Sequence, residues 1–546
     1  MVRFSFVRIP VAIRPTFWIT VSLLGLQNGL GGVQLFAWVA AVFLAVLLHE
    51  LGHAFAARSA GADFIEVELY FLGGMTMWSS PGPLAPLRRL GVAAAGSGVG
   101  IVLGLLAILP LRFVPMSEDA TVFIQSFVFA ALVWGVLNWV PIRSLDGGVM
   151  VSSALEWLLP RRGKLVAEAM LFGFGVVGIA VALAFGQWFI AAIVGFFGLS
   201  GFNALREAWN EYRDDRGLGR HWESFEANHW AGEFEQAAQM AEQVVGDARS
   251  AAWRNRAHEE AVRNWYLAGV LDRAVEAGDA WEEAGYHASW VAVQAYLDAG
   301  RTRDVQRIAS PGVVSAPVLA GPLAVVDVML DNTDRLDELV AKFPEPLATY
   351  LPMKVSDKVG PLDSYSRRQV VQLLDRLPSI PSVQKVAATI EAGWADRALA
   401  MLDDLDPTPD LQALRVHALH VAGREEAALA LLEEIAMYAP TVTAQVVAIK
   451  TGRFEIAEAV GEVLVERGGP SLHVALYNHA CVASLTGRKA EAIERTSRAI
   501  DAGFTVVRSL NFDPDIAAIR QDPIFQSLRT KAWHGQQIAF GTPQPQ

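Results

Sequence analysis

The sequence predicts an all-α membrane bundle of about six transmembrane helices with one short β-hairpin, followed by an α-helical solenoid. The chain has 546 residues, of which 53% are hydrophobic and only 19% are charged, whereas soluble proteins average about 25% charged. Residues 1–205 carry 11 Lys and Arg against 9 Asp and Glu, and the remainder carries 34 against 48. A charge-poor first third therefore precedes an acidic two-thirds. The acidic part excludes nucleic acid from the expected partners, because phosphate binding needs clustered basic residues.

This break in composition predicts four segments. We expect a membrane-embedded domain over residues 1–206, a linker over 207–221, a helical repeat domain over 222–536 and a flexible tail over 537–546. The single cysteine, Cys481, rules out an intramolecular disulfide and a Cys-rich zinc site. Any metal must therefore be held by His, Asp or Glu.

The membrane domain is predicted from runs of apolar residues, because a spanning helix needs about 20 of them. The first run is short and follows three arginines, so a signal peptide is an alternative interpretation. No small-x-small cleavage site precedes Gly31, and further spans follow, so we expect an uncleaved first span. The six predicted spans are Pro15–Asn28, Gly32–Ala57, Leu90–Leu109, Thr121–Val140, Leu165–Phe185 and Gln187–Ala204.

The distribution of basic residues predicts the orientation of these spans in the lipid bilayer. With the N-terminus in the cytoplasm, the inside segments hold ten of the 11 Lys and Arg of residues 1–205, and only Arg112 lies outside. Lys and Arg are enriched in cytoplasmic loops of membrane proteins. We therefore expect a multi-pass integral membrane protein with both termini in the cytoplasm, located in the bacterial inner (cell) membrane.

Residues Phe64–Trp78 have a period of two. Ile65, Val67 and Leu69 alternate with more polar positions until Gly73–Gly74 interrupts the pattern, which predicts a strand or small hairpin. An amphipathic loop on the membrane surface is the alternative. An open strand edge cannot face lipid, so this strand must be paired, wet or covered by protein.

The second span ends in LLHELGHAFAAR. His49 and His53 are one helical turn apart on one face, so both imidazoles can reach a single zinc ion. Glu50 stands between them and can deprotonate a water held by that metal. The alternative is a set of polar residues that reach the headgroups, but burying them at the end of an apolar span is costly without a function.

A catalytic zinc usually takes three protein ligands. Asp146, in the segment NWVPIRSLDGGVM, is expected at the same cytoplasmic end, and the two glycines after it let the backbone approach closely. Capping of a helix over Val149–Leu159 is the alternative role for this carboxylate. Glu156 and Glu168 are rival ligands. We expect one Zn²⁺ per chain, held by the two histidines and Asp146.

These motifs resemble the site-2 proteases, which are intramembrane zinc metalloproteases. The resemblance covers about residues 8–205 and includes HELGH and the pattern N-x-x-P-x-x-x-L-D-G that starts at Asn138. One departure is the third span, where Ala95–Gly100 lacks the Pro and Asn of the A-G-P-x-x-N motif but keeps a small-residue seam suited to helix packing. The resemblance implies these roles: zinc binding by His49, His53 and Asp146; general-base catalysis by Glu50; support of the substrate backbone or the developing oxyanion by Asn138; and pairing of an unwound substrate segment with the strand near Gly73 and Gly74.

The function implied by this resemblance is hydrolysis of peptide bonds within or near the transmembrane segment of a membrane protein substrate. This is regulated intramembrane proteolysis. Two other functions stay open. One is a catalytically impaired membrane anchor or scaffold that presents the repeat domain. The other is a metal transporter, which would need polar residues on several spans, whereas the other spans here are almost without them.

The acidic two-thirds contains a recurring glycine followed five residues later by a small or apolar residue. This pattern resembles degenerate tetratricopeptide repeats, in which the glycine ends one helix and the small residue lets the next helix pack closely. A HEAT-like array is the alternative. Either array offers a concave surface for a cytoplasmic protein or peptide, either a substrate or a regulator. The pairs are Gly232/Ala237, Gly269/Ala274, Gly300/Val305, Gly393/Ala398, Gly423/Ala428, Gly452/Ala457 and Gly487/Ala492.

Overall fold

The computed structural model describes residues 2–62, 64–71, 73–80, 84–143, 145–284, 290–308, 317–358, 362–377 and 380–539. The chain divides into two compact units, Met1–Arg216 and Gly217–Gln546. The expected linker, residues 207–221, is mostly helical, since it contains the end of one helix and the start of the next. Of the expected tail, residues 537–539 belong to the last helix and residues 540–546 lie outside the described residues.

The first unit contains eight described helices. Their bounds are α1 (Pro15–Gln27), α2 (Gly32–Ser59), α3 (Pro86–Leu106), α4 (Ile108–Phe113), α5 (Glu118–Asn138), α6 (Asp146–Leu158), α7 (Gly163–Ala184) and α8 (Trp188–Gly217).

Four described segments are long and apolar enough to cross a membrane: α2, Pro86–Phe113 (which contains α3 and α4), α5 and α7. Large apolar side chains on these segments face outward, for example Phe36, Phe113 and Val177, which are 74%, 78% and 59% exposed. Lipid is the surrounding in which such surfaces are stable. Helix α1 has only 13 residues, and several side chains of α8 lie outside the described set. The count of six spans therefore stays a prediction.

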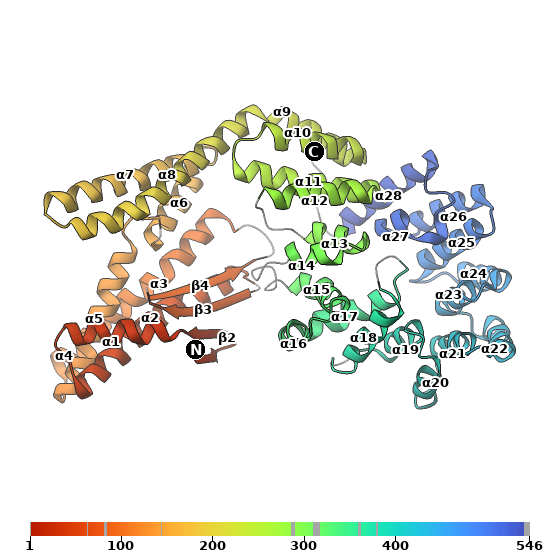
Figure 1. Ribbon diagram of the computed structural model, residues 1–546, viewed down its shortest axis with the longest axis horizontal. Coiled ribbons are helices and arrows are strands. Elements are labelled where there is room, and N and C mark those ends of the chain that lie inside the picture. Colours follow the sequence, from red (N-terminus) through yellow and green to blue (C-terminus); the bar gives the residue numbers. More distant parts are fainter. Residues whose placement is uncertain are drawn as a thin grey trace. The chain divides into compact units, whose positions relative to one another are not determined.

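A four-stranded sheet in the order β1-β2-β3-β4 packs against α2 (Figure 1). Its strands are β1 (Val2–Phe6), β2 (Ile9–Ile13), β3 (Phe64–Tyr70) and β4 (Gly73–Ser79). Strands β1 and β2 are antiparallel, β2 and β3 are parallel, and β3 and β4 form an antiparallel hairpin. Strand β4 is at the edge of the sheet. The predicted hairpin is present, but the sequence analysis missed β1 and β2.

One reason for this miss is that β1 and β2 form a hairpin whose turn residues, Val7 and Arg8, are not typical of turns. Another is that β2 also pairs with a strand far away in the sequence. Val11 lies opposite Val67 in the parallel ladder, so the pairing leaves no local turn signal. Within β3 the predicted alternation is observed, because Ile65, Val67 and Leu69 are all buried. Their face forms a core with Phe17 of α1 and with the buried face of α2.

Helices α2 and α3 approach each other closely at Gly52. A Cβ atom at this position would lie 2.9 Å from both the carbonyl oxygen of Ala95 and the Cα of Gly96. Small residues on both helices therefore allow backbone-to-backbone packing. This close packing brings α3 against the half of α2 that carries His49 and His53.

The second unit is helical throughout its described elements. The bounds are α9 (Gly219–Ala231), α10 (Phe234–Asp247), α11 (Ala251–Ala268), α12 (Leu271–Glu283), α13 (Trp290–Asp298), α14 (Thr302–Ile308), α15 (Pro317–Met329), α16 (Thr333–Lys342), α17 (Pro344–Val355), α18 (Ser364–Leu374), α19 (Ser382–Glu391), α20 (Ala395–Asp403), α21 (Pro409–Val421), α22 (Glu425–Tyr438), α23 (Val442–Lys450), α24 (Phe454–Arg467), α25 (Leu472–Leu485), α26 (Lys489–Asp501), α27 (Val507–Phe512), η2 (Pro514–Ile516) and α28 (Pro523–Ala539).

The recurring glycines of this unit lie between consecutive helices. All seven have a positive φ between 71° and 82°, which is the left-handed conformation that ends helices and that glycine adopts without strain. All seven residues that follow five positions later are buried. These are the local features that the sequence pattern predicts. The identification of the helices as tetratricopeptide repeats, and as a solenoid, stays a prediction.

The last helices of this unit return to its first helices. Arg508 of α27 donates hydrogen bonds of 2.8 and 2.9 Å to Asp298 of α13, and Arg529 of α28 donates to the carbonyl oxygen of Ala268 at 2.9 Å. Trp533 of α28 is buried against Phe234 of α10. Figure 1 shows α27 and α28, in blue, beside α11. The ends of the helical array are therefore in contact with each other, which the sequence did not predict.

Candidate metal centre and active site

Two helices bring the predicted metal ligands together. His49 and His53 lie one turn apart on α2, and Asp146 is the first residue of α6. The Nε2 atoms of the histidines are 3.2 Å apart. The Oδ2 atom of Asp146 lies 3.4 Å from Nε2 of His49 and 3.3 Å from Nε2 of His53. Both histidines are buried, so the three ligand atoms form a compact triangle inside the protein.

The size of this triangle fits a zinc ion. Zinc binds nitrogen and oxygen ligands at about 2.0–2.2 Å in tetrahedral geometry, which places neighbouring ligand atoms about 3.3–3.5 Å apart. The three observed distances are close to this range. Two imidazoles and one carboxylate also leave a fourth position for water or substrate, as catalytic sites require. The residues present therefore suit a catalytic zinc.

Neighbouring groups hold these three side chains in place. Nδ1 of His53 lies 2.8 Å from the carbonyl oxygen of Val92. This oxygen only accepts hydrogen bonds, so Nδ1 carries the proton and Nε2 keeps its lone pair for the metal. The hydroxyl of Ser97 donates to Oδ2 of Asp146 at 2.7 Å. The side-chain amide of Asn138 lies 3.4 Å from Nε2 of His49, so this predicted residue also borders the centre.

Glycine is required where α3 passes the metal ligands. A Cβ atom at Gly96 would lie 2.2 Å from Nε2 of His53, so any side chain there would displace the imidazole. Ser97 follows directly and is fully buried. The segment that departs from the A-G-P-x-x-N motif therefore supplies a close approach to His53 and a hydrogen bond to Asp146. The sequence analysis read this segment only as a packing seam and missed the role of Ser97.

Strand β4 packs against the side chain of Glu50 and hydrogen-bonds to its carboxylate. The carboxylate is buried, and its Oε2 accepts a hydrogen bond of 2.7 Å from the hydroxyl of Thr76. A Cβ atom at Gly74 would lie 2.4 Å from Cγ of Glu50, so the start of β4 lies directly against this side chain. A Cβ atom at Gly73 would instead meet Trp134 of α5 at 2.8 Å. Thr76 is a further residue that the sequence analysis missed, because no motif marks it.

The rival ligands lie elsewhere. Glu156 forms an ion pair with Arg89, and Glu168 forms one with Arg143 at 2.8 Å. Neither belongs to the group of ligand atoms formed with His49 and His53. Asp146 begins α6 as a residue of its first turn, and the N-cap position belongs to Leu145.

Two other places in the described chain bring polar or charged side chains close together. Cys481, Asp513 and Asp515 offer ligand atoms close together, but the ammonium group of Lys358 forms ion pairs with both aspartates. A pocket of about 410 Å³ lies at the turn before α20.

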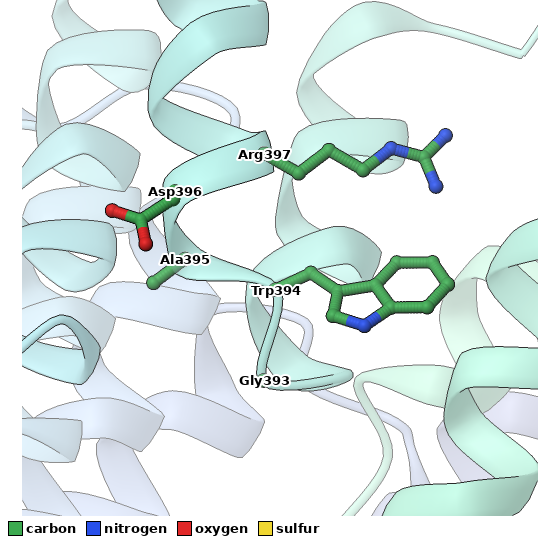
Figure 2. Close-up of a pocket in the computed structure, with 5 residues that line it drawn as sticks. All are labelled: Gly393, Trp394, Ala395, Asp396 and Arg397. Atoms are coloured by element: carbon green, nitrogen blue, oxygen red, sulfur yellow. The ribbon is translucent and has the colours of Figure 1, made fainter.

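Figure 2 shows that Trp394 and Arg397 extend to one side of this pocket and Asp396 to the other. The guanidinium of Arg397 lies 5.1 Å from the ring centre of Trp394 and pairs with Asp375 at 2.7 Å. Asp396 pairs with Arg424 at 3.3 Å. Because both charged side chains already have ion-pair partners, this pocket offers fewer groups for catalysis or metal binding than the centre formed by His49, His53 and Asp146.

Comparison with known proteins gives several similarities. No protein-family model matches the chain. A protein of Synechocystis sp. named as a zinc metalloprotease is 26% identical over 191 residues, which cover 32% of this chain and 49% of the relative. A zinc metalloprotease of Methanocaldococcus jannaschii is 24% identical over 200 residues, covering 34% and 57%. The similarities support a zinc metalloprotease.

Two further matches were found. Rip3 of Mycobacterium tuberculosis, also named as a zinc metalloprotease, is 31% identical over 175 residues, which cover 28% of this chain and 44% of the relative. Among solved structures, the site-2 protease from Methanocaldococcus jannaschii covers 37% of this chain and 94% of its own, with 19% identity and a TM-score of 0.29. The chain spans about half the length of the curated relatives it matches.

Proposed function

We propose that this protein is an intramembrane zinc endopeptidase of the site-2 protease type. It hydrolyses peptide bonds within or near the transmembrane segment of membrane protein substrates, as in regulated intramembrane proteolysis. The observation that carries this proposal is the triangle of ligand atoms from His49, His53 and Asp146, with Glu50 beside it. His49, Glu50 and His53 belong to α2, a helix apolar enough to cross a membrane, and Asp146 begins α6. The names of the curated relatives support the protease class and the metal.

The chemistry follows from the side chains around this centre. Zinc, when bound, supplies a Lewis acid that polarises a carbonyl group and makes water acidic enough to react near neutral pH. Glu50 accepts the proton of the attacking water and donates it to the leaving amide nitrogen. Thr76 fixes the direction of this carboxylate through its 2.7 Å hydrogen bond. Asn138 donates its amide hydrogen to the oxygen that becomes negative in the transition state.

The substrate approaches as an extended segment along β4. A peptide bond in a helix is shielded by its own hydrogen bonds, whereas an extended segment exposes it, and an edge strand can pair with such a segment. Strand β4 is at the edge of the sheet, and Gly74 lies directly against Glu50. Pairing along β4 would therefore bring a substrate backbone next to the general base.

The remaining parts of the proposal concern location and partners. We place the protein in the bacterial inner membrane with both termini in the cytoplasm, supported by the excess of Lys and Arg in the expected inside segments. The helical unit Gly217–Gln546 then binds a cytoplasmic protein or peptide, either the tail of a substrate or a regulator. One zinc ion per chain suffices for the reaction.

The test is zinc-dependent cleavage by purified protein in detergent or liposomes. We expect a transmembrane peptide to be cut by the wild-type protein, not after zinc chelation, and again after zinc is restored. The variant Glu50→Gln should bind zinc without cleaving. A protein that holds zinc but cuts no membrane protein would instead support the alternative of a membrane scaffold.

A further inference from the structure

An apolar pocket of about 430 Å³ lies beside the candidate active site. It is enclosed by α1, α2, α5 and the ends of β3 and β4 around their turn. Aromatic rings form much of its wall, and the polar side-chain groups of the lining are those of Thr20, Asn28 and Tyr70 and the indole N–H groups of Trp38 and Trp134. The indole of Trp38 donates to the carbonyl oxygen of Val21 at 2.9 Å. The amide of Asn28 is already used in a hydrogen bond to the carbonyl oxygen of Leu24. The wall includes Phe17, Trp38, Phe71, Phe129, Val133 and Trp134.

The start of β4 connects this pocket to the general base. Successive residues of a strand point to opposite faces. At Gly73 the side-chain direction leads to Trp134, which lines the pocket, and at Gly74 it leads to Glu50. The pocket and the general base are therefore on opposite faces of β4, one residue apart along the strand.

If a substrate strand pairs with the edge strand β4, its side chains point to the same two faces of the sheet as those of β4. Residues directly opposite each other in paired strands have their side chains on the same face. A substrate residue opposite Gly73 then points toward the pocket, while its neighbour opposite Gly74 lies on the face of Glu50. The peptide bond at Glu50 is thus flanked by a residue whose side chain is directed into the pocket.

We propose that this pocket is a specificity pocket that takes a large apolar side chain, such as Leu or Phe, from a substrate residue adjacent to the cut bond. This inference rests on the proposed protease function and adds the sequence preference of the same site. The wall offers no free charge to a charged side chain, and burying an unpaired charge is costly. A small side chain such as Ala would leave the pocket partly empty and lose packing contacts.

The first experiment measures this preference in the full-length protein. The cut bond in one synthetic transmembrane peptide is located by mass spectrometry. Each flanking residue is then varied among Ala, Leu, Phe and Asp in peptides that are otherwise identical. At one of the two positions we expect kcat/KM for Leu or Phe to exceed that for Ala by about 10- to 100-fold, the range that one hydrophobic pocket provides. Asp should be cut least.

Variants of the wall then assign the preference to this pocket. Ala130→Phe places a ring in the pocket and should reduce cleavage of the Leu and Phe peptides while sparing the Ala peptide. Leu137→Ala enlarges the pocket and should shift the preference toward Phe. Ala180→Phe on α7 is the matched control, because Ala180 is exposed and outside the pocket; it should change none of these ratios.

Two outcomes would overturn the inference. Zinc-dependent cleavage whose preferences are the same in the wild type and both wall variants would exclude a specificity pocket. An equal loss for all peptides in Ala130→Phe and Leu137→Ala would indicate a structural or lipid-filled cavity. The absence of zinc-dependent cleavage in the wild type would instead contradict the proposed function.

A binding readout tests the pocket without turnover. A peptide with a photoreactive leucine at the preferred position is irradiated with the variant Glu50→Gln, which binds the peptide but does not cut it. We expect crosslinks to Val133 or Trp134 of α5. Crosslinks to the wall residues Phe17 or Trp38 would also support the inference, whereas crosslinks confined to residues outside the pocket wall would overturn it.

Discussion

Glu50 and the three ligand candidates lie in one cluster but have separable roles. Removing a ligand should remove the metal, whereas removing the base should remove only the reaction. We expect His49→Ala and Asp146→Ala to lose most of their zinc. We expect Glu50→Gln to keep its zinc and to lose at least about 10²-fold in kcat. Metal analysis and peptide cleavage on the same preparations check this, and full zinc in Asp146→Ala would place the third ligand elsewhere.

Ser97 holds Asp146 through a hydrogen bond of 2.7 Å, and this gives a second prediction. Groups that hydrogen-bond to metal ligands typically contribute about 10- to 100-fold to metal affinity. We therefore expect Ser97→Ala to weaken zinc affinity by about this factor without loss of the fold. Ser126→Ala is the control, since Ser126 is also buried but does not contact the ligands. Competition with a chelator measures the affinities, and equal values for the two variants would contradict the prediction.

The residues of the centre differ in how far the sequence predicts them. The spacing of His49 and His53 follows from helix geometry alone, and Asp146 follows from its expected depth in the membrane. Thr76 and Ser97 approach the centre from β4 and α3, through contacts 26 and 49 residues apart in the sequence. No local pattern indicates such partners, because only the packing of the helices and the sheet brings them together.

At the scale of single elements, β4 gives a test of substrate pairing. Proline removes a backbone donor, whereas alanine keeps it. If β4 pairs with the substrate through its backbone, Met75→Pro should reduce turnover by at least about tenfold and Met75→Ala should change it only slightly. Met75 is 43% exposed, so a change of side chain alone disturbs little packing. Zinc content serves as the control for folding, and equal turnover in the two variants would indicate a side-chain role instead.

The sheet and the spans show what local patterns can and cannot predict. The alternation in Phe64–Tyr70 predicted β3 because one face of this strand is buried. Strand β2 was missed because its pairing with β3 joins distant residues such as Val11 and Val67, and β1 was missed because its hairpin with β2 turns at Val7 and Arg8, which are not typical turn residues. For the helices, α2 and α5 follow from length and apolar composition. The expected first span, Pro15–Asn28, forms a helix of only 13 residues, α1, which is not among the four described segments long enough to cross a membrane.

At the scale of the second unit, His417 gives a prediction for pH dependence. Burial is the main cause that lowers the pKa of His417 to about 4 from an ordinary value of 6.5. The unfolded chain then binds a proton more readily than the folded unit between these values, so the free energy of unfolding should decrease as the pH falls from 6.5 to 4. The expected loss is at most about 3 kcal/mol.

The measurement is thermal or denaturant unfolding of the protein at several pH values, compared with His417→Gln. The pKa of Asp327 is raised to about 6, mainly by burial. Its protonation in the same pH range therefore increases the free energy of unfolding as the pH falls, which opposes the effect of His417. The difference between the wild type and the variant isolates the histidine. We expect the difference in the free energy of unfolding between the two proteins to shrink as the pH falls. A difference that stays constant with pH would contradict the lowered pKa of His417.

For the whole molecule, the division after Arg216 separates the residues proposed for catalysis from the unit proposed to bind a substrate tail or a regulator. All residues of the candidate centre lie before this point, and the second unit has its own core and contacts between its first and last helices. We therefore expect a protein truncated after Arg216 to fold, bind zinc and cut a minimal transmembrane peptide at a rate within about tenfold of the full chain. It should lose its selectivity for a natural substrate with a cytoplasmic tail, because the unit proposed to bind this tail is absent.

Comparing both proteins on both substrates in one detergent tests this division. The acidic charge of the second unit allows a separate test of tail binding, since residues 217–546 carry 31 Lys and Arg against 44 Asp and Glu. Binding of a basic tail to an acidic unit should weaken with salt, while cleavage of the minimal peptide should not. If the truncated protein keeps zinc but cuts neither substrate, the second unit is itself needed for the reaction, because the residues of the centre would be present and still inactive.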